Sequence, residues 1–219
     1  MNPRQLQELS AQSNDSGFTI IESLVAILVV AILLVAIAPV LVMSTATRVQ
    51  AKRVELATGA AKAFVDAIKS KTISDPTITV TLTASTTRNV SSSSSDYLLS
   101  STLAPTASTG LYCFNKNGSL ANPDCTSDLF YIQAIRVAVT DSDADKGQGY
   151  RLGVRVYRSD AFIGTGSLKK GSDSNGKTAA TFTGGLGDRK APLVEMTTEI
   201  VRGQSSYSAL CDRLGGCQP

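Results

Sequence analysis

Histidine and tryptophan are both absent from the 219 residues of the chain. Without histidine the sequence lacks the commonest general base and the commonest metal ligand, which excludes histidine-dependent triads and most zinc chemistry. Charge of one sign is also lacking: 21 basic and 18 acidic side chains are mixed along the chain, and no long basic tract indicates a nucleic-acid partner. Phosphate-binding glycine loops, GxSxG turns and paired-carboxylate signatures do not occur either. The sequence therefore favours a non-enzymatic protein and predicts no cofactor.

Cysteine is scarce, with four residues that all lie in the C-terminal half. An even number of cysteines in an exported portion favours disulfide bonds. Local pairing of Cys113 with Cys125 and of Cys211 with Cys217 is the simplest of three connectivities, and crossed pairing remains open. A four-thiolate zinc site would need closer spacing than either pair offers.

One segment is strongly apolar. Leu24–Met43 holds 20 consecutive uncharged residues, which span roughly 30 Å as a helix, the thickness of a bilayer's hydrocarbon core. The run is longer than the apolar core of a secretory signal, and no small-residue cleavage site follows it. A membrane-spanning helix is the expectation. Glu22 stands just before the run, where a carboxylate in hydrocarbon costs roughly 2.5–3.5 kcal/mol. Either Glu22 reaches the interface, or a partner charge offsets this cost.

The stretch G-F-T-I-I-E-S-L-V-A-I-L-V-V, from Gly17 onward, resembles the N-terminus of type IV prepilins and pseudopilins. The resemblance implies that a prepilin peptidase removes residues 1–17 as a leader and N-methylates the new first residue, Phe18. It also implies that Glu22 is needed for assembly, through a pair with the amine of Phe18 in an adjacent subunit. Pro39 falls where such pilins often carry a helix-kinking proline, and it should bend or locally melt the helix.

The helix should continue well beyond the apolar run. Six residues of the next 26 fall on one helical face, so the second half of the helix is amphipathic and should dock on a globular body. We therefore expect a leader at 1–17, a helix at 18–71 with its transmembrane segment at 24–43, and a globular domain at 72–219. The predicted docking face consists of Ala57, Ala60, Ala61, Phe64, Val65 and Ile68.

Strand patterns occur only after the helix. They are β-branched or alternating stretches, and the polar segment 141–149 between two of them predicts a hairpin. The Ser/Thr-rich segment 85–101 is expected to be a surface loop. The fold class is therefore α+β: one long helix on a small antiparallel β-sheet, as in type IV pilins. The predicted strands are Thr77–Thr83, Phe130–Val139, Tyr150–Arg158 and Pro192–Arg202.

The polar segment 141–149 also contains a weak calcium candidate. Asp141, Asp143 and Asp145 match the start of a calcium-binding loop. Lys146 stands where an EF-hand needs glycine, and Leu152 stands where it needs the bidentate glutamate. An acidic hairpin tip is the better interpretation.

The leading functional hypothesis is a minor pilin or pseudopilin. Such a subunit would be anchored in the inner (plasma) membrane with its C-terminal domain outside the cytoplasm, and would then enter a pilus or pseudopilus. Its partners would be other pilins, the prepilin peptidase, the assembly platform and the lipid bilayer. Residues 45–64 also look similar to cyanobacterial pseudopilins linked to hormogonium polysaccharide secretion, which would serve secretion or cell motility. The alternative is a membrane-anchored extracellular binding module that never polymerises.

Overall fold

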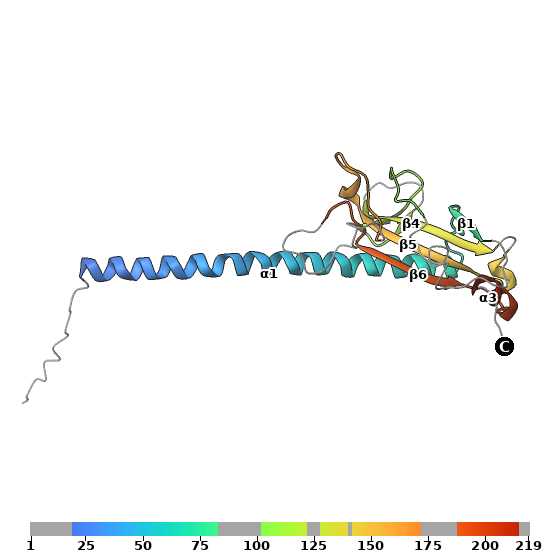
Figure 1. Cartoon of the computed structure of the whole chain (residues 1–219), viewed down its shortest axis with the longest axis horizontal. Coiled ribbons are helices and arrows are strands. Elements are labelled where there is room, and N and C mark those ends of the chain that lie inside the picture. Colours follow the sequence, from blue (N-terminus) through green and yellow to red (C-terminus); the bar gives the residue numbers. More distant parts are fainter. Residues whose placement is uncertain (1–18, 83–101, 122–127, 140–141, 172–187, 215–219) are drawn as a thin grey trace, which may run out of the picture. The chain divides into compact units, whose positions relative to one another are not determined.

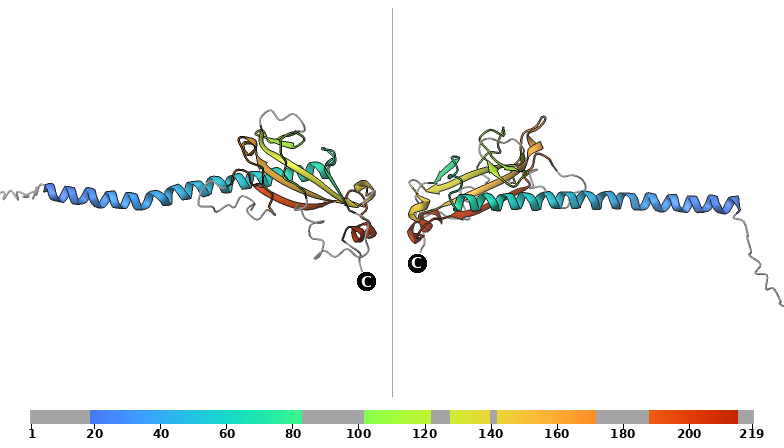
Figure 2. Two further views of the ribbon diagram at one scale, coloured as in Figure 1. Left: turned by 45° about the horizontal axis from the view of Figure 1, so that its top comes forward. Right: turned by 180° about the vertical axis from the view of Figure 1, so that it is seen from behind.

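The computed structural model describes residues 19–82, 102–121, 128–139, 142–171 and 188–214. It divides the chain into two compact units, Met1–Ser44 and Thr45–Pro219. Helix α1, Ile20–Lys69, contributes to both of them. Figure 1 shows the labelled elements, and Figure 2 gives two further views in which the second half of α1 lies along one face of the sheet.

In the first unit, α1 is the only regular element among the described residues, 19–44. Every large apolar side chain from Ile20 to Met43 is exposed, with accessible fractions between 44% and 88%. The helix is long and apolar enough to cross a membrane. Residues on both sides of Pro39 are helical, so the local melting expected at this proline is not seen.

The second unit contains a six-stranded sheet in the order β3-β2-β4-β5-β6, with β1 added on β4. Strand β4 is long, and its edge opposite β5 is shared: β2 pairs with its first half and β1 with its second half. The strands are β1 (Thr79–Leu82), β2 (Tyr112–Asn115), β3 (Leu120–Ala121), β4 (Asp128–Val139), β5 (Tyr150–Arg158) and β6 (Val194–Ile200).

All four predicted strands are present, and the α+β prediction is confirmed. The predicted hairpin joins β4 to β5 in antiparallel register, with Ile132 opposite Val156 and Ala134 opposite Val154. The sequence predicted a purely antiparallel sheet. The sheet is instead mixed, because β1 runs parallel to β4. The Ser/Thr-rich stretch 85–101 lies outside the described residues.

The core forms between the sheet and the second half of α1. The predicted docking face is buried throughout, and its alanines let the helix backbone approach the strands closely. The ring of Phe64 packs on that of Tyr112 with 4.7 Å between centroids. Every second residue of β5 completes this core: Leu152, Val154 and Val156 are fully buried.

The opposite face of the sheet carries a buried charge. The side chain of Arg155 is inaccessible to solvent, and its Nε lies 2.6 Å from the Glu195 carboxylate. Arg155 also donates to Gln133 and to the carbonyl of Thr102, while the backbone N–H of Gly171 donates to Glu195. Each charge is therefore neutralised or hydrogen-bonded, as burial requires, and the network ties two loop segments to the sheet.

Sequence patterns missed the strands β2 and β3 and the helix α3. Strands β2 and β3 form a hairpin whose turn contains Asn117 and Gly118, and Gly118 adopts a left-handed conformation with φ of 84°. The Asn-Gly dipeptide is a strong hairpin signal and would have predicted this turn. The missed helix α3 is short, Tyr207–Leu214, and lies close to the C-terminus.

Candidate functional site

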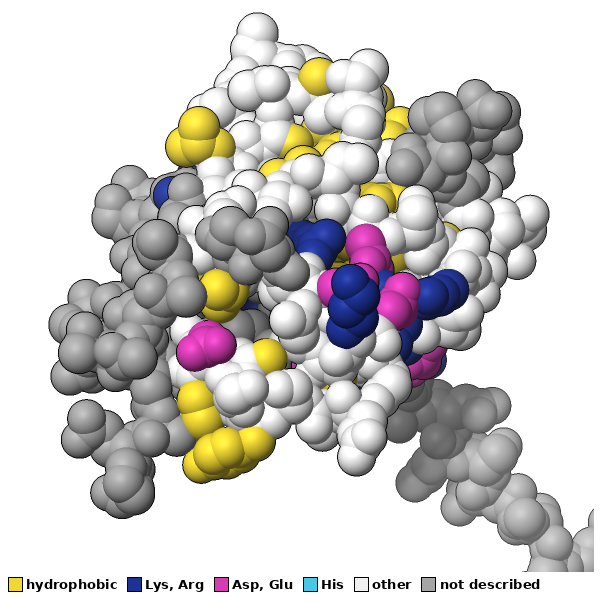
Figure 3. Space-filling model, turned by 90° about the vertical axis from the view of Figure 1, so that its right-hand side faces the viewer, with side chains coloured by type: hydrophobic (Ala, Val, Ile, Leu, Met, Phe, Trp, Pro, Cys, Tyr) yellow, Lys and Arg dark blue, Asp and Glu magenta, His cyan; other side chains and the backbone are white. Residues whose placement is uncertain are grey.

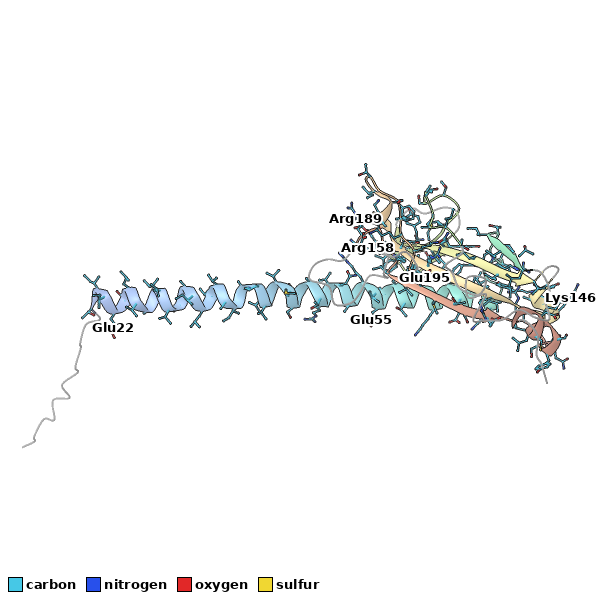
Figure 4. The ribbon with its side chains drawn as sticks, viewed as in Figure 1. Glu22, Glu55, Lys146, Arg158, Arg189 and Glu195 are labelled. Carbon is cyan, nitrogen blue, oxygen red and sulfur yellow. The ribbon has the colours of Figure 1, made fainter. Side chains whose placement is uncertain are left out.

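The N-terminal end of α1 is the first candidate site. Glu22 lies in the first turn of the helix and is exposed (Figure 4). Its backbone N–H donates to the hydroxyl of Thr19 at 3.3 Å, so Thr19 caps the helix. Thr19 and Glu22 have the spacing of a capping box, a sequence signal for the start of a helix. Gly17 and Phe18, the predicted processing residues, lie outside the described residues.

The exposed apolar segment of α1 comes directly after Glu22 in the chain. A helix that is apolar on all sides is stable only inside lipid or against other apolar helices. The described part of the first unit does not bury this helix, since the most apolar stretch of α1 is entirely exposed. The apolar surface of this segment is suited to burial, either in a bilayer or among helices of other chains.

A second cluster surrounds the C-terminal end of α1, and we call it the Arg202 clamp. It consists of Lys71, Asp75, Asp145, Tyr150 and Arg202. The Arg202 guanidinium contacts Asp75 at 2.6 Å through one nitrogen and Asp145 at 2.7 Å through another, and it also donates to the carbonyl of Ile68. Figure 3 faces the α3 end of the second unit and shows basic and acidic side chains interleaved there.

The clamp joins three separate parts of the second unit. Ile68 is in the last turn of α1, Asp75 follows that helix, and Asp145 is in the connection between β4 and β5. Arg202 comes just after β6 and also donates its backbone N–H to the carbonyl of Ala144. The Ile68 carbonyl already accepts from the backbone N–H of Lys71, and Arg202 adds a second hydrogen bond to it. The clamp therefore fixes the end of α1 to two loops.

The pKa shifts within the clamp favour ionised carboxylates and a neutral Tyr150. Burial alone would raise the pKa of Asp75, but hydrogen bonds from Arg202 and Tyr150 outweigh it and hold that pKa below its usual range. Hydrogen bonds from Lys71 and Arg202 likewise lower the pKa of Asp145. Burial and the neighbouring Asp75 carboxylate raise the pKa of Tyr150 well above the ordinary value of a phenol. Tyr150 therefore stays neutral and donates to Asp75 at 2.7 Å.

The weak calcium candidate is not assembled as a cation site by the described residues. The Asp145 carboxylate is taken up by Lys71 at 2.6 Å and by Arg202. Asp143 accepts from the backbone N–H of Asp145 and caps the short 3-10 helix η2, Ala144–Lys146. Asp141 lies outside the described residues, which contain no cluster of three or more potential metal ligands. The acidic tip is thus used for ion pairs and a cap.

The cysteines are described only in part. Cys113 in β2 and Cys211 in α3 are both disulfide-bonded. Cys125 and Cys217 lie outside the described residues, so the local pairings Cys113–Cys125 and Cys211–Cys217 stay predictions.

Comparison with known proteins gives one match. Residues 12–38 match the family model described as the prokaryotic N-terminal methylation motif, which is characteristic of type IV pilins and pseudopilins. The match covers the predicted cleavage site between Gly17 and Phe18, Glu22 and most of the apolar run. Comparisons with curated proteins and with solved structures found no match. The chain therefore carries the N-terminal methylation motif that is characteristic of type IV pilins and pseudopilins, on an apolar helix that continues into an α+β unit.

Proposed function

We propose that this chain is a minor pilin or pseudopilin, a structural subunit of a type IV pilus or of a secretion-type filament. The observation that carries the proposal is the exposed apolar face of α1, which begins with one carboxylate, Glu22, and coincides with the methylation motif. Before assembly the segment 24–43 anchors the chain in the inner membrane, with the second unit outside the cytoplasm. During assembly each helix exchanges lipid for the helices of neighbouring subunits.

Glu22 sets the register of this exchange. A prepilin peptidase cuts between Gly17 and Phe18, which creates an amine that is absent from the precursor. The carboxylate of Glu22 then pairs with the Phe18 amine of an adjacent subunit on the assembly platform. Pairing offsets the cost of burying the carboxylate, and a single buried polar contact of this kind is well suited to fixing register. The filament serves polysaccharide secretion or cell motility.

Two measurements test this function. Mass spectrometry of the mature protein should find an N-methylated Phe18 as the first residue, and an intact Met1 or a cut elsewhere would remove the assignment. In cells, Glu22→Leu and Glu22→Gln should abolish or strongly reduce filaments. Asp66→Asn is the matched control, because Asp66 is an exposed carboxylate on the second half of the same helix. Filaments unchanged by either Glu22 variant would favour the membrane-anchored binding module.

A further inference from the structure

One end of the second unit carries an excess of basic side chains. Two loop segments at this end, 158–171 and 188–190, together hold five basic and two acidic residues. The segments lie side by side, because the backbone N–H of Lys169 donates to the carbonyl of Lys190 and the Lys169 ammonium pairs with Asp188. Their positive charge is therefore concentrated in one region of the surface.

This region adjoins the first turns of α1 in the second unit. A groove of about 240 Å³ lies between them and is lined by Arg53 of α1 and by Arg158 at the end of β5. At the start of β5, Tyr150 belongs to the Arg202 clamp, which holds the Ile68 end of α1. Figure 4 shows Arg158 and Lys146 at opposite ends of the second unit. The sheet thus lies along α1 with its basic side chains toward the start of the unit.

The start of the unit follows closely on the apolar run, which ends at Met43. Arg48, Lys52 and Arg53 come five, nine and ten residues later, at about 7–15 Å along a helix. The polar layer of a bilayer is about 5–8 Å thick on each side, and the potential of charged headgroups extends roughly 8–10 Å further. All three basic residues are within its range. Ile68, about 38 Å after Met43, is far beyond it.

An exposed apolar side chain stands among the basic groups. Ile163 is 65% exposed and precedes a turn in which Gly164 and Gly166 have left-handed φ values of 81° and 101°. The Lys190 ammonium donates to the carbonyl of Ile163 at 3.3 Å, and a Cβ atom added to Gly164 would lie 3.8 Å from the guanidinium of Arg189. An apolar side chain within a ring of basic groups is suited to the surface of an anionic bilayer, where apolar groups enter the acyl boundary and cations contact the headgroups.

We propose that this basic end, residues 48–53, 158–171 and 188–190, docks on anionic phospholipid headgroups of the bilayer that the apolar segment of the same chain spans. Ile163 enters the interface. A membrane helix is tilted by about 20° on average, which brings one side of such a unit closer to the surface. The inference rests on the membrane anchor of the proposed function and does not require assembly. It adds a lipid contact that the subunit must break when it leaves the bilayer.

Photocrosslinking in the full chain tests the contact directly. A photoreactive amino acid replaces Ile163, and the chain is reconstituted into vesicles of phosphatidylcholine alone or with about 30% phosphatidylglycerol. Lipid adducts should be at least about fivefold more frequent in the anionic vesicles, because the basic groups hold the turn at that surface. Salt at about 1 M shortens the Debye length to about 3 Å and should remove most of this difference. The same probe at Leu28 is the positive control, and at Tyr207, which is 73% exposed at the other end of the unit, the negative one.

Charge reversal identifies the basic groups as the cause. Lys52→Glu combined with Arg189→Glu should lower the adduct yield at position 163 by at least about fivefold in the anionic vesicles. Both residues are exposed, so the fold should tolerate the change. Lys146→Glu is the matched control, because the Lys146 side chain is 77% exposed at the opposite end, and it should leave the yield unchanged. Thermal unfolding of all variants in detergent should match that of the parent chain, which separates lost docking from misfolding.

Equal adduct yields in neutral and anionic vesicles would overturn the proposal. So would the absence of lipid adducts at position 163 while position 28 gives them, and in that case the membrane anchor of the proposed function stands. In cells, adducts at position 163 that contain protein or acidic polysaccharide but no lipid would also overturn it. If neither position links to lipid, the membrane anchor itself fails.

Discussion

Arg202→Ala tests whether the Arg202 clamp holds α1 to the sheet domain. The substitution removes two contacts to Asp75 and the bond to the Ile68 carbonyl, and it leaves the Asp75 carboxylate without its main partner. Hydrogen bonds to charged groups contribute about 1.5–3 kcal/mol each, and breaking a fully buried pair costs about 3–5 kcal/mol. Because 26% of the Asp75 side chain is exposed, water recovers part of that cost. We expect a loss of about 2–3 kcal/mol in the free energy of unfolding.

The assay is urea denaturation of the second unit, Thr45–Pro219, produced under oxidising conditions. Lys169→Ala is the control, since Lys169 and Asp188 form a more exposed pair, at 36% and 41%, and such pairs contribute about 0–1 kcal/mol. A double-mutant cycle of Arg202→Ala with Asp75→Asn should give a coupling energy of about 1.5–3 kcal/mol. A coupling near zero would refute the clamp, because the two residues would then act independently.

The pH dependence of the same cycle follows from the Asp75 pKa. This pKa is lower in the folded unit than the unfolded value of about 3.9, so the carboxylate stabilises the fold above about pH 4. The contribution is lost as the pH falls through the folded pKa. The stability difference between the parent unit and Asp75→Asn should therefore be full at pH 7 and shrink below about pH 4. A difference that persists unchanged at low pH would mean that the charge of Asp75 is not what stabilises the unit.

Three further predictions concern the second unit. Phe64→Ala should lower its stability by about 3–5 kcal/mol in urea denaturation, because Phe64 is fully buried against the sheet; a loss below about 1 kcal/mol would contradict the packing. Lys71→Gly should raise the thermal midpoint of unfolding slightly. Lys71 has a φ of 58°, which costs roughly 1 kcal/mol, whereas its ion pair with Asp145 is exposed and weak. A lowered midpoint would show that the ion pair contributes more than the backbone strain costs. Peptide mapping without reduction should find the two local disulfides Cys113–Cys125 and Cys211–Cys217, and a crossed pair would contradict the prediction.

Local periodicity explains which parts of the fold could be predicted. The docking face of α1 repeats with helical spacing, and β5 alternates over nine residues, so both follow from the sequence alone. The parallel pairing of β1 with β4 could not be predicted, because four residues of β-branched pattern do not specify which strand they meet. Strands β2 and β3 are four and two residues long, too short for periodicity to reveal.

Contacts distant in sequence explain what was missed in the candidate sites. Arg202 and Asp75 are 127 residues apart, and nothing in the spacing of either one identifies the other. Arg155 alternates with valines in β5 and would ordinarily point into solvent. It is buried because loop residues such as Thr102 supply carbonyl acceptors on that face. Such networks depend on where loops fold back, which a local pattern does not encode.

Two free energies bear on Glu22: its stabilisation at the helix N-terminus in the single chain, and the cost of burying its carboxylate in an assembly. In the single chain it lies in the first turn of α1, where the helix dipole and the Thr19 cap favour a carboxylate by about 0.3–1 kcal/mol. Burial of a carboxylate among apolar helices costs roughly 2.5–3.5 kcal/mol on insertion scales. The helix terminus therefore stabilises an exposed Glu22 carboxylate. Once the carboxylate is buried, about 2 kcal/mol of the burial cost remains uncompensated. The pair proposed between Glu22 and the Phe18 amine of an adjacent subunit would offset a cost of this size. On that proposal, Glu22→Gln should preserve α1 in the membrane and fail specifically at assembly.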